Sequence, residues 1–127
     1  MNIMQNIVDG MNLRMQRERA EQQMTLGKMI ATLEKMPQDT LIDGISNPHS
    51  YRGYYCDLAF SRTDKKTSVA DALAMCRGAM GQFFVGYKGG DFAMGALTPL
   101  WIAHYGSCGD KIVDILPDGT IETAEED

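Results

Sequence analysis

The sequence predicts an α+β protein in which two or three helices accompany an antiparallel sheet. Two segments combine helical apolar spacing with N-cap residues, later segments alternate in the manner of strands, and Pro-Asp-Gly at 117–119 is typical of a hairpin turn. With 127 residues the chain can form one domain with its own core. We expect an N-terminal oligomerisation helix over 1–23, a single α+β ligand-binding domain over 24–123 and an acidic tail over 124–127, and we expect the acidic end 122–127 to be frayed.

The N-terminal segment 3–23 is expected to be an amphipathic helix. Its apolar residues recur at helical spacing: Met4, Val8, Met11 and Met15, with Ile3 and Ile7 beside them. Gly10 weakens this helix by about 1 kcal/mol relative to alanine, so the helix needs a packing partner. Two interpretations stay open: the apolar stripe packs on its own domain, or it meets copies of itself and builds an oligomer.

Two further helices carry start and stop signals. Thr25 is expected to cap the second helix, and Pro37 ends it. Ser68 and Asp71 match a capping box at the start of the third helix, and Gly81 is placed to end it.

The remaining segments predict strands. Their expected ranges are 40–45, 51–60, 83–85, 99–104, 112–116 and 120–123, with a turn at 46–48. In the range 51–60, alternation assigns Tyr54, Cys56, Leu58 and Phe60 to one face and Tyr55, Asp57 and Ala59 to the other. Gly53 inside this strand indicates a bulge or a close approach by a ligand.

Composition excludes several classes of protein. A net charge of −5 and a pI near 4.9 argue against a general nucleic-acid binder, although a small anionic ligand can still be held by a few local cations. No apolar run approaches the roughly 18 residues that a membrane span needs. Three widely spaced cysteines are typical of free thiols in a reducing compartment. We therefore expect a cytoplasmic protein that does not enter a membrane.

Three glycine-containing segments share a polar and aromatic character: 83–92, 49–55 and 104–109. Tyrosine offers a ring for stacking, arginine or lysine can bind a phosphate, and glycine lets the backbone approach a ligand closely. The glycines of 86–91 match neither a P-loop nor a dinucleotide fingerprint. The segments therefore predict a ligand-binding surface, and glycines that only make turns are the plainer alternative.

The candidate ligand-binding residues are taken from these three segments. Tyr54, Phe83 and Tyr87 would stack on the ligand, Arg52 and Lys88 would bind phosphate, and Gly89, Gly90 and Asp91 would add polar contacts. Tyr51 and His104 complete the set. The plainer alternatives are a surface ion pair for Arg52, a capping role for Asp91 and, outside the set, core packing for Trp101.

No catalytic or metal-binding residues are predicted. His104 and Cys108 could resemble a base and its nucleophile, but they span a strand end and a Gly-Ser-Cys-Gly turn that does not fix their geometry. The two histidines and the two nearest cysteines lack the short paired spacings of zinc sites. We expect no cofactor.

The segments 25–39, 50–55 and 86–92 together resemble a small phage-encoded protein. Over roughly residues 25–116 the chain is similar to the anti-Thoeris sponge family, which sequesters cyclic ADP-ribose isomers. The resemblance implies a compact α+β protein that assembles as dimers and often hexamers, and that binds its signal without cleaving it. Some members of that family are similar to sponges for cyclic oligonucleotides as well.

The expected function is therefore a non-enzymatic, cytoplasmic binder of a small cyclic nucleotide-type signal, with a pocket between two copies. The first alternative is a structural or host-takeover interaction protein of a phage that has no small ligand. A hydrolase of the same nucleotides is the second alternative.

Overall fold

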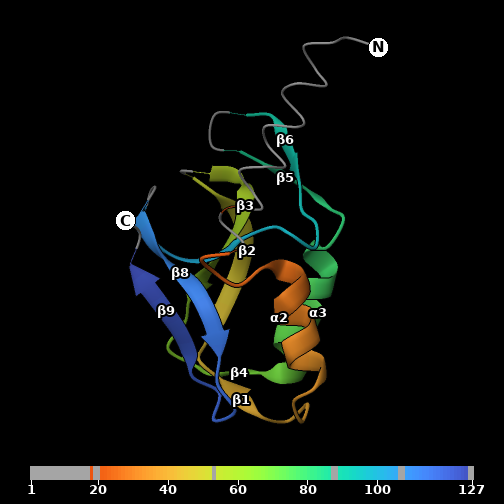
Figure 1. The fold of residues 1–127 in the computed structure, drawn as a ribbon, viewed down its shortest axis with the longest axis vertical. Helices are drawn as coiled ribbons and strands as arrows, with labels where there is room; N and C mark the ends of the chain where they lie inside the picture. Colours follow the sequence, from red (N-terminus) through yellow and green to blue (C-terminus); the bar gives the residue numbers. More distant parts are fainter. Residues whose placement is uncertain (1–17, 19–20, 53, 87–88, 106–107, 126–127) are drawn as a thin grey trace.

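The computed structural model describes residues 18, 21–52, 54–86, 89–105 and 108–125, in which two helices pack against strands (Figure 1). Each helix begins at the residue that the sequence predicts. The Thr25 hydroxyl accepts from the Lys28 N–H at 3.2 Å before α2 (Leu26–Glu34), and the Ser68 hydroxyl accepts from the Asp71 N–H at 3.1 Å before α3 (Val69–Ala79). Gly81 follows α3 with a φ of +77°. The prediction of these two capped helices is confirmed.

A five-stranded sheet forms the centre of the fold, in the order β2-β3-β7-β8-β9. The strands are β2 (Ile45–Tyr51), β3 (Tyr54–Arg62), β7 (Leu100–Tyr105), β8 (Cys108–Ile115) and β9 (Ile121–Glu125). Neighbours along the chain pair antiparallel, but β3 and β7 are parallel because α3 lies between them and carries the chain back. The sheet is therefore mixed, and the prediction of a purely antiparallel sheet is wrong for this one pair.

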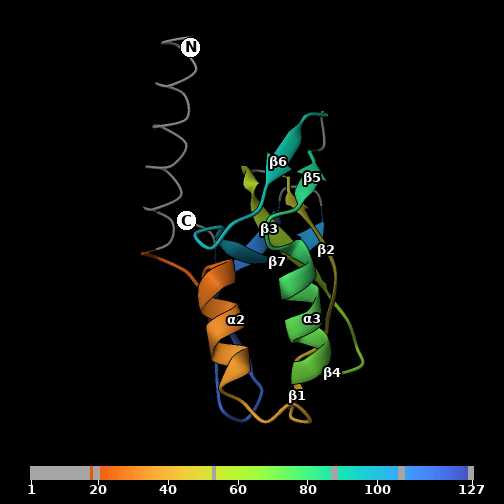
Figure 2. The same ribbon diagram turned by 90° about the vertical axis from the view of Figure 1, so that its right-hand side faces the viewer.

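Two small sheets complete the described strands. In the first, β1 (Leu41–Ile42) pairs with β4 (Thr67–Ser68), and in the second β5 (Phe83–Val85) pairs with β6 (Asp91–Ala93). The β5–β6 hairpin stands beyond the end of α3, at the opposite end of the molecule from β1 and β4 (Figures 1 and 2).

The main core lies between the helices and one face of the five-stranded sheet. Helices α2 and α3 run side by side over this face (Figure 2). Their apolar positions meet residues from β3, β7, β8 and β9. The largest of the fully buried side chains in this core are Met24, Leu26, Met29, Leu33, Ile42, Leu58, Phe60, Met94, Leu100 and Ile102. Burial of this surface is the main favourable contribution to folding.

The predicted turn at 46–48 is wrong, because these residues lie inside β2. The pairing of β2 with β3 shifts register between Ser46 and His49, and Asn47 has a φ of +51°. The turn-forming residues thus make a bulge in an edge strand, where Pro48 removes no ladder bond to a further neighbour. Tyr51 consequently ends β2, and β3 begins only at Tyr54.

The later strands are longer or more numerous than the sequence predicts. The predicted loop after β5 contains β6, and β8 begins at Cys108 rather than at 112. β9 pairs with β8 through Glu125, so the prediction of a frayed end is wrong over 122–125. The hairpin turn at 117–119 is confirmed, with Gly119 at a φ of +95°.

Most of the predicted N-terminal helix lies outside the described residues. At its expected end, residues 21–23 form a turn and a bend rather than a helix. Met24 then enters the core: its N–H donates to the Ile112 carbonyl at 2.6 Å, and its carbonyl accepts from the Leu100 N–H at 3.0 Å. Among the described residues, no helix has the length and hydropathy required to cross a membrane.

Candidate ligand-binding site

Two of the three glycine-containing segments meet through a pair of aromatic rings. The Tyr55 ring at the start of β3 stacks on the Phe92 ring of β6, with centroids 5.2 Å apart and planes at 30°. Gly86 lies against both rings, since a Cβ on it would be 2.7 Å from Phe92 Cε2 and 3.1 Å from Tyr55 Cδ1. The β5–β6 hairpin is thereby fixed beside the beginning of β3. Neither ring was among the predicted site residues.

The glycines at the tip of the β5–β6 hairpin shape a tight turn. The Gly86 N–H donates to the Gly90 carbonyl at 3.0 Å, and the Gly89 N–H donates to the Gly86 carbonyl at 2.9 Å. Gly89 and Gly90 have φ values of +90° and +84°, which L side chains rarely adopt. The Gly89 N–H is thus used inside the turn. Tyr87 and Lys88 lie outside the described residues.

A stack of three aromatic rings lies on the sheet face opposite the helices. Tyr51 and Trp101 are nearly parallel with centroids 4.3 Å apart, and Tyr54 lies 5.8 Å from Trp101. Tyr51 and Trp101 are each about 1% exposed, whereas Tyr54 is only partly buried. Tyr54 is therefore the ring through which the stack reaches the surface, and the exposed Arg52 lies close to it in the chain.

A buried carboxylate anchors this stack. Asp57 is fully buried, and its Oδ2 accepts from the Trp101 indole Nε1–H at 2.8 Å. A polar group in such a place needs partners, because burial without hydrogen bonds is costly. The sequence contained a signal that could have found it: Asp57 directly precedes the apolar run 58–60, where a charged residue is unexpected in a strand.

The predicted faces of β3 are wrong at its beginning. Tyr54 packs with Ala59 and Trp101, while Tyr55 points to the hairpin side. The cause is a register shift, because β2 pairs Ser50 with Leu58 but Tyr51 with Tyr54. Strict alternation cannot pass through this irregularity. Gly53, which was expected to mark it, lies outside the described residues.

Phe83 and Asp91 lie on the outer face of the hairpin. Phe83 is opposite Ala93 and Val85 is opposite Asp91, and all of them are exposed. The alternate residues, Phe84 and Phe92, face inward and pack against the main core. The structure therefore does not bring Phe83 and Asp91 into the Tyr51–Trp101–Tyr54 stack.

His104 lies on the helix side of the sheet, away from the stack. Its Nε2 is 3.0 Å from Asp110 Oδ2, and Asp110 is opposite Ile102, a residue of the main core. Trp101 and Ala103 point to the other face. Of the third segment, Gly109 does reach the stack, since a Cβ on it would lie 3.0 Å from Tyr51 Cε2.

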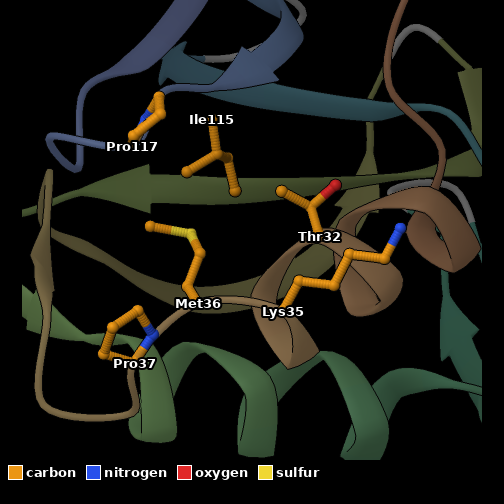
Figure 3. A pocket seen from close by; sticks show the side chains of 6 residues that line it. All are labelled: Thr32, Lys35, Met36, Pro37, Ile115 and Pro117. Atoms are coloured by element: carbon orange, nitrogen blue, oxygen red, sulfur yellow. The ribbon is translucent and has the colours of Figure 1, made fainter.

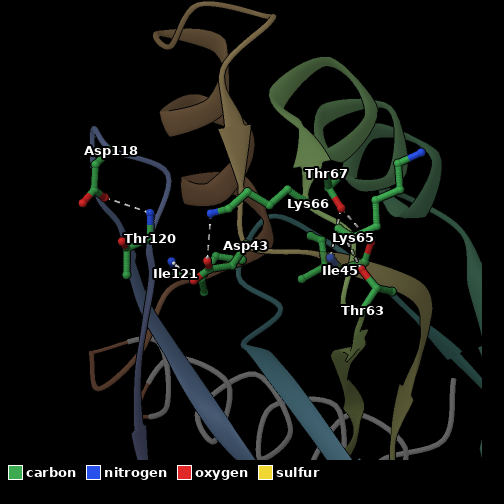
Figure 4. Close-up of polar contacts among 9 residues, drawn as sticks. All are labelled: Asp43, Ile45, Thr63, Lys65, Lys66, Thr67, Asp118, Thr120 and Ile121. Carbon is green, nitrogen blue, oxygen red and sulfur yellow. Dashed lines mark hydrogen bonds and ion pairs between the residues drawn. The ribbon is translucent and has the colours of Figure 1, made fainter.

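Two pockets lie elsewhere on the described part of the molecule. One of about 340 Å³ is mostly apolar and opens between the end of α2 and the β8–β9 turn, lined by Thr32, Lys35, Met36, Pro37, Ile115 and Pro117 (Figure 3). The other, of about 370 Å³, lies near the start of α3, but the Lys65 and Lys66 side chains extend away from each other (Figure 4). The first pocket has few polar groups, and in the second the Thr63 and Thr67 hydroxyls already donate to the Lys65 and Ile45 carbonyls. The described residues hold no group of three potential metal ligands.

The Cys76 thiol is unreactive in the folded protein at neutral pH. Burial raises its pKa to about 12, because the apolar surroundings disfavour the thiolate. We expect a thiol reagent at pH 8 to modify the exposed Cys108 quickly and Cys76 only on unfolding. The raised pKa also means that this group stabilises the fold below its unfolded value near 9, and that the contribution is lost as the pH rises toward 12. Mass spectrometry of labelled peptides over time checks the order of modification.

Searches of family models, of curated proteins and of solved structures give no match to this chain.

Proposed function

We propose that this protein binds and sequesters a small cyclic nucleotide-type signal, such as a cyclic ADP-ribose isomer, at the joined tips of the β2–β3 and β5–β6 hairpins. The observation that carries the proposal is the contact between Tyr55 and Phe92, which holds two segments with aromatic, cationic and glycine residues together. In this role the protein would act in the cytoplasm of a phage-infected cell and counteract an immune pathway.

The chemistry of the two tips suits such a ligand. Tyr54 has a partly exposed ring for a base, supported from behind by Trp101 and Tyr51. Arg52 is exposed at the same tip and can bind a phosphate with two parallel hydrogen bonds. The Trp101–Asp57 hydrogen bond fixes the stack before any ligand arrives. A preformed surface binds more tightly than one that must be ordered on binding.

Binding without cleavage is supported by the position of His104, the base candidate of the sequence. His104 contacts Asp110 and lies on the other side of the sheet from Tyr54. We further propose that the protein works as a homo-oligomer, a dimer or a hexamer, in which a second copy encloses the ligand.

Retention of an intact ligand tests this function. The purified protein is incubated with cyclic ADP-ribose isomers and cyclic oligonucleotides, desalted, heat-denatured, and the supernatant is analysed by mass spectrometry. Release of an unchanged compound supports a sponge. A chemically altered compound would mean an enzyme, and no retention of any compound would contradict the proposal.

Substitutions at the β2–β3 tip localise the site. Tyr54→Leu should weaken binding about 10- to 100-fold, because one ring–base stack contributes about 1 to 3 kcal/mol. Arg52→Gln should have a similar effect through the phosphate. Arg62→Gln, an exposed arginine at the other end of β3, is the matched control and should bind as the unaltered protein does. Calorimetric titration with the retained compound measures all of them, and equal affinities would remove this tip from the site.

A second candidate is an interaction protein of a phage particle or host-takeover complex. The observation that favours it is the exposure of Phe83 and Val85, which are 69% and 70% accessible on one short strand. Large apolar side chains exposed side by side often mark a protein contact. The retention experiment distinguishes the two candidates, because an interaction protein retains no nucleotide.

A further inference from the structure

The outer edge of β5 offers backbone groups for another strand. Within the β5–β6 hairpin, the Gly86 N–H donates to the Gly90 carbonyl, and the Met94 N–H donates to the Gln82 carbonyl. Even-numbered residues of β5 therefore direct their backbone groups to β6. Because successive residues of a strand alternate in direction, Phe83 and Val85 direct their N–H and C=O groups outward. In the described residues, no hydrogen bond outside the hairpin uses these groups.

The same two residues form the exposed apolar face of β5. Phe83 and Val85 are each about 70% exposed, and Phe84 between them packs inward. A two-stranded hairpin is marginal by itself in water. An exposed apolar edge strand of this kind pairs readily with another strand.

We propose that this edge is the pairing surface for a second copy of the chain, through an antiparallel β5–β5 contact centred on Phe84. In this register Phe83 of one copy lies opposite Val85 of the other, and Val85 lies opposite Phe83. Both are the residues whose backbone groups point outward, so each pair exchanges both of its N–H···O=C hydrogen bonds. Aromatic residues beside β-branched ones are favourable cross-strand neighbours. The β5–β6 hairpins would join into a sheet of four strands.

Self-complementarity and charge favour a second copy as the occupant. Antiparallel pairing of β5 with its own copy has the two-fold symmetry that an isologous dimer interface requires. The chain carries a net charge of −5, so copies must meet where acidic residues are few. β5 has no charged residue. By contrast, the edges of the five-stranded sheet carry a bulge with Pro48 on β2 and Glu122 and Glu125 on β9, devices that oppose pairing.

This inference goes beyond ligand binding and is tested without any ligand. The mass of the full chain is measured by light scattering and sedimentation over a range of concentrations. We expect an assembly of two or more copies. Phe83→Lys and Val85→Glu should each weaken it at least about tenfold, since a charge would then be buried opposite an apolar side chain. A monomeric unaltered chain, or single variants with unchanged mass, would overturn the proposal.

The double variant Phe83→Lys with Val85→Glu tests the register. Each lysine would then lie opposite a glutamate of the other copy, so the assembly should recover relative to both single variants. Failure of the double variant to recover, with its fold intact by circular dichroism, would exclude this register. Leu97→Lys is the control, because Leu97 is an exposed apolar residue outside β5. It should leave the mass unchanged.

Val85→Pro provides a test that adds no charge. The Val85 N–H points away from β6, so proline removes an intermolecular hydrogen bond while the β5–β6 ladder keeps its own. We expect an unchanged thermal unfolding midpoint at low concentration and a weaker assembly. An assembly as strong as that of the unaltered chain would show that this edge is not paired.

Discussion

Replacing Trp101 with phenylalanine should lower the free energy of unfolding by about 3 kcal/mol, because the buried Asp57 carboxylate then loses the indole N–H donor. Trp101 is almost completely buried, and its indole Nε1–H donates to Asp57 at 2.8 Å. Phenylalanine keeps most of the apolar contact with Tyr51 but cannot donate. Urea unfolding followed by circular dichroism measures the difference.

Two control variants separate the hydrogen bond from loss of volume. Ile102→Val, the next residue of β7, removes one methylene group from the main core and should cost about 1 kcal/mol. Asp57→Asn keeps an oxygen that accepts from the indole, so it should be milder than Trp101→Phe. If Trp101→Phe costs no more than Ile102→Val, the Trp101–Asp57 bond contributes little to the fold.

The same variant bears on ligand binding. Tyr54 stacks on Trp101 at 5.8 Å and on Tyr51 at 6.3 Å, so these two rings determine where its partly exposed ring lies. Loss of the Trp101 ring that supports Tyr54 should therefore lower ligand affinity, even though Trp101 itself is inaccessible to the ligand. This dependence makes Trp101 a positioning residue for the proposed site rather than a contact.

The sequence predicted correctly those features that depend on interactions between residues close together in the chain. The caps at Thr25 and Ser68 and the turn at Gly119 involve residues within a few positions of one another, so the sequence contains the whole interaction. The residues 46–48 have equally strong turn signals, yet they form a bulge because pairing with β3 fixes both sides of them. Tertiary pairing there outweighs turn propensity.

In the candidate site, too, the sequence identified the unusual segments but not the long-range contacts between them. Composition alone identified Tyr51, Arg52 and Tyr54 and the glycine turn 86–91 as unusual segments. Their relation depends on Tyr55 and Phe92, whose contact spans 37 positions of the chain and follows from the register shift in β3. Periodicity gives no access to that shift, so the sequence could not reveal this contact or the separation of His104 from the stack.

Hydrogen bonds join the β8–β9 turn to the chain beside β1, partly shown in Figure 4. We call this contact, made by Asp43, Gly119 and Ile121, the seam. The Asp43 N–H donates to the Gly119 carbonyl at 2.9 Å, and Asp43 Oδ2 accepts from the Ile121 N–H at 2.9 Å. Lys66 forms an ion pair with Asp43 at 3.7 Å. At the turn itself, hydrogen bonds from Thr120 hold the pKa of Asp118 below its usual value. Gly119 leaves no room for a side chain in this seam, since an added Cβ would meet the Leu41 carbonyl oxygen.

Gly119→Ala should therefore destabilise the protein by about 2 to 5 kcal/mol. Its φ of +95° costs a side-chain-bearing residue about 1 to 2 kcal/mol, and overpacking adds about 1 to 3 kcal/mol. The overpacking arises because an added Cβ would collide with the Leu41 carbonyl oxygen, a backbone atom that can move only if β1 separates from the turn. Urea unfolding gives the free energy, and hydrogen exchange at Asp43 and Ile121 should accelerate.

Gly81→Ala is the matched control, because Gly81 also has a positive φ, +77°, but no atom lies within 4 Å of its added Cβ. It should lose only the conformational part, about 1 to 2 kcal/mol. The difference between the two variants then measures the close contact of the turn with β1. Equal losses at the two glycines would mean that β1 moves aside freely, and that the seam does not hold the C-terminal hairpin in place.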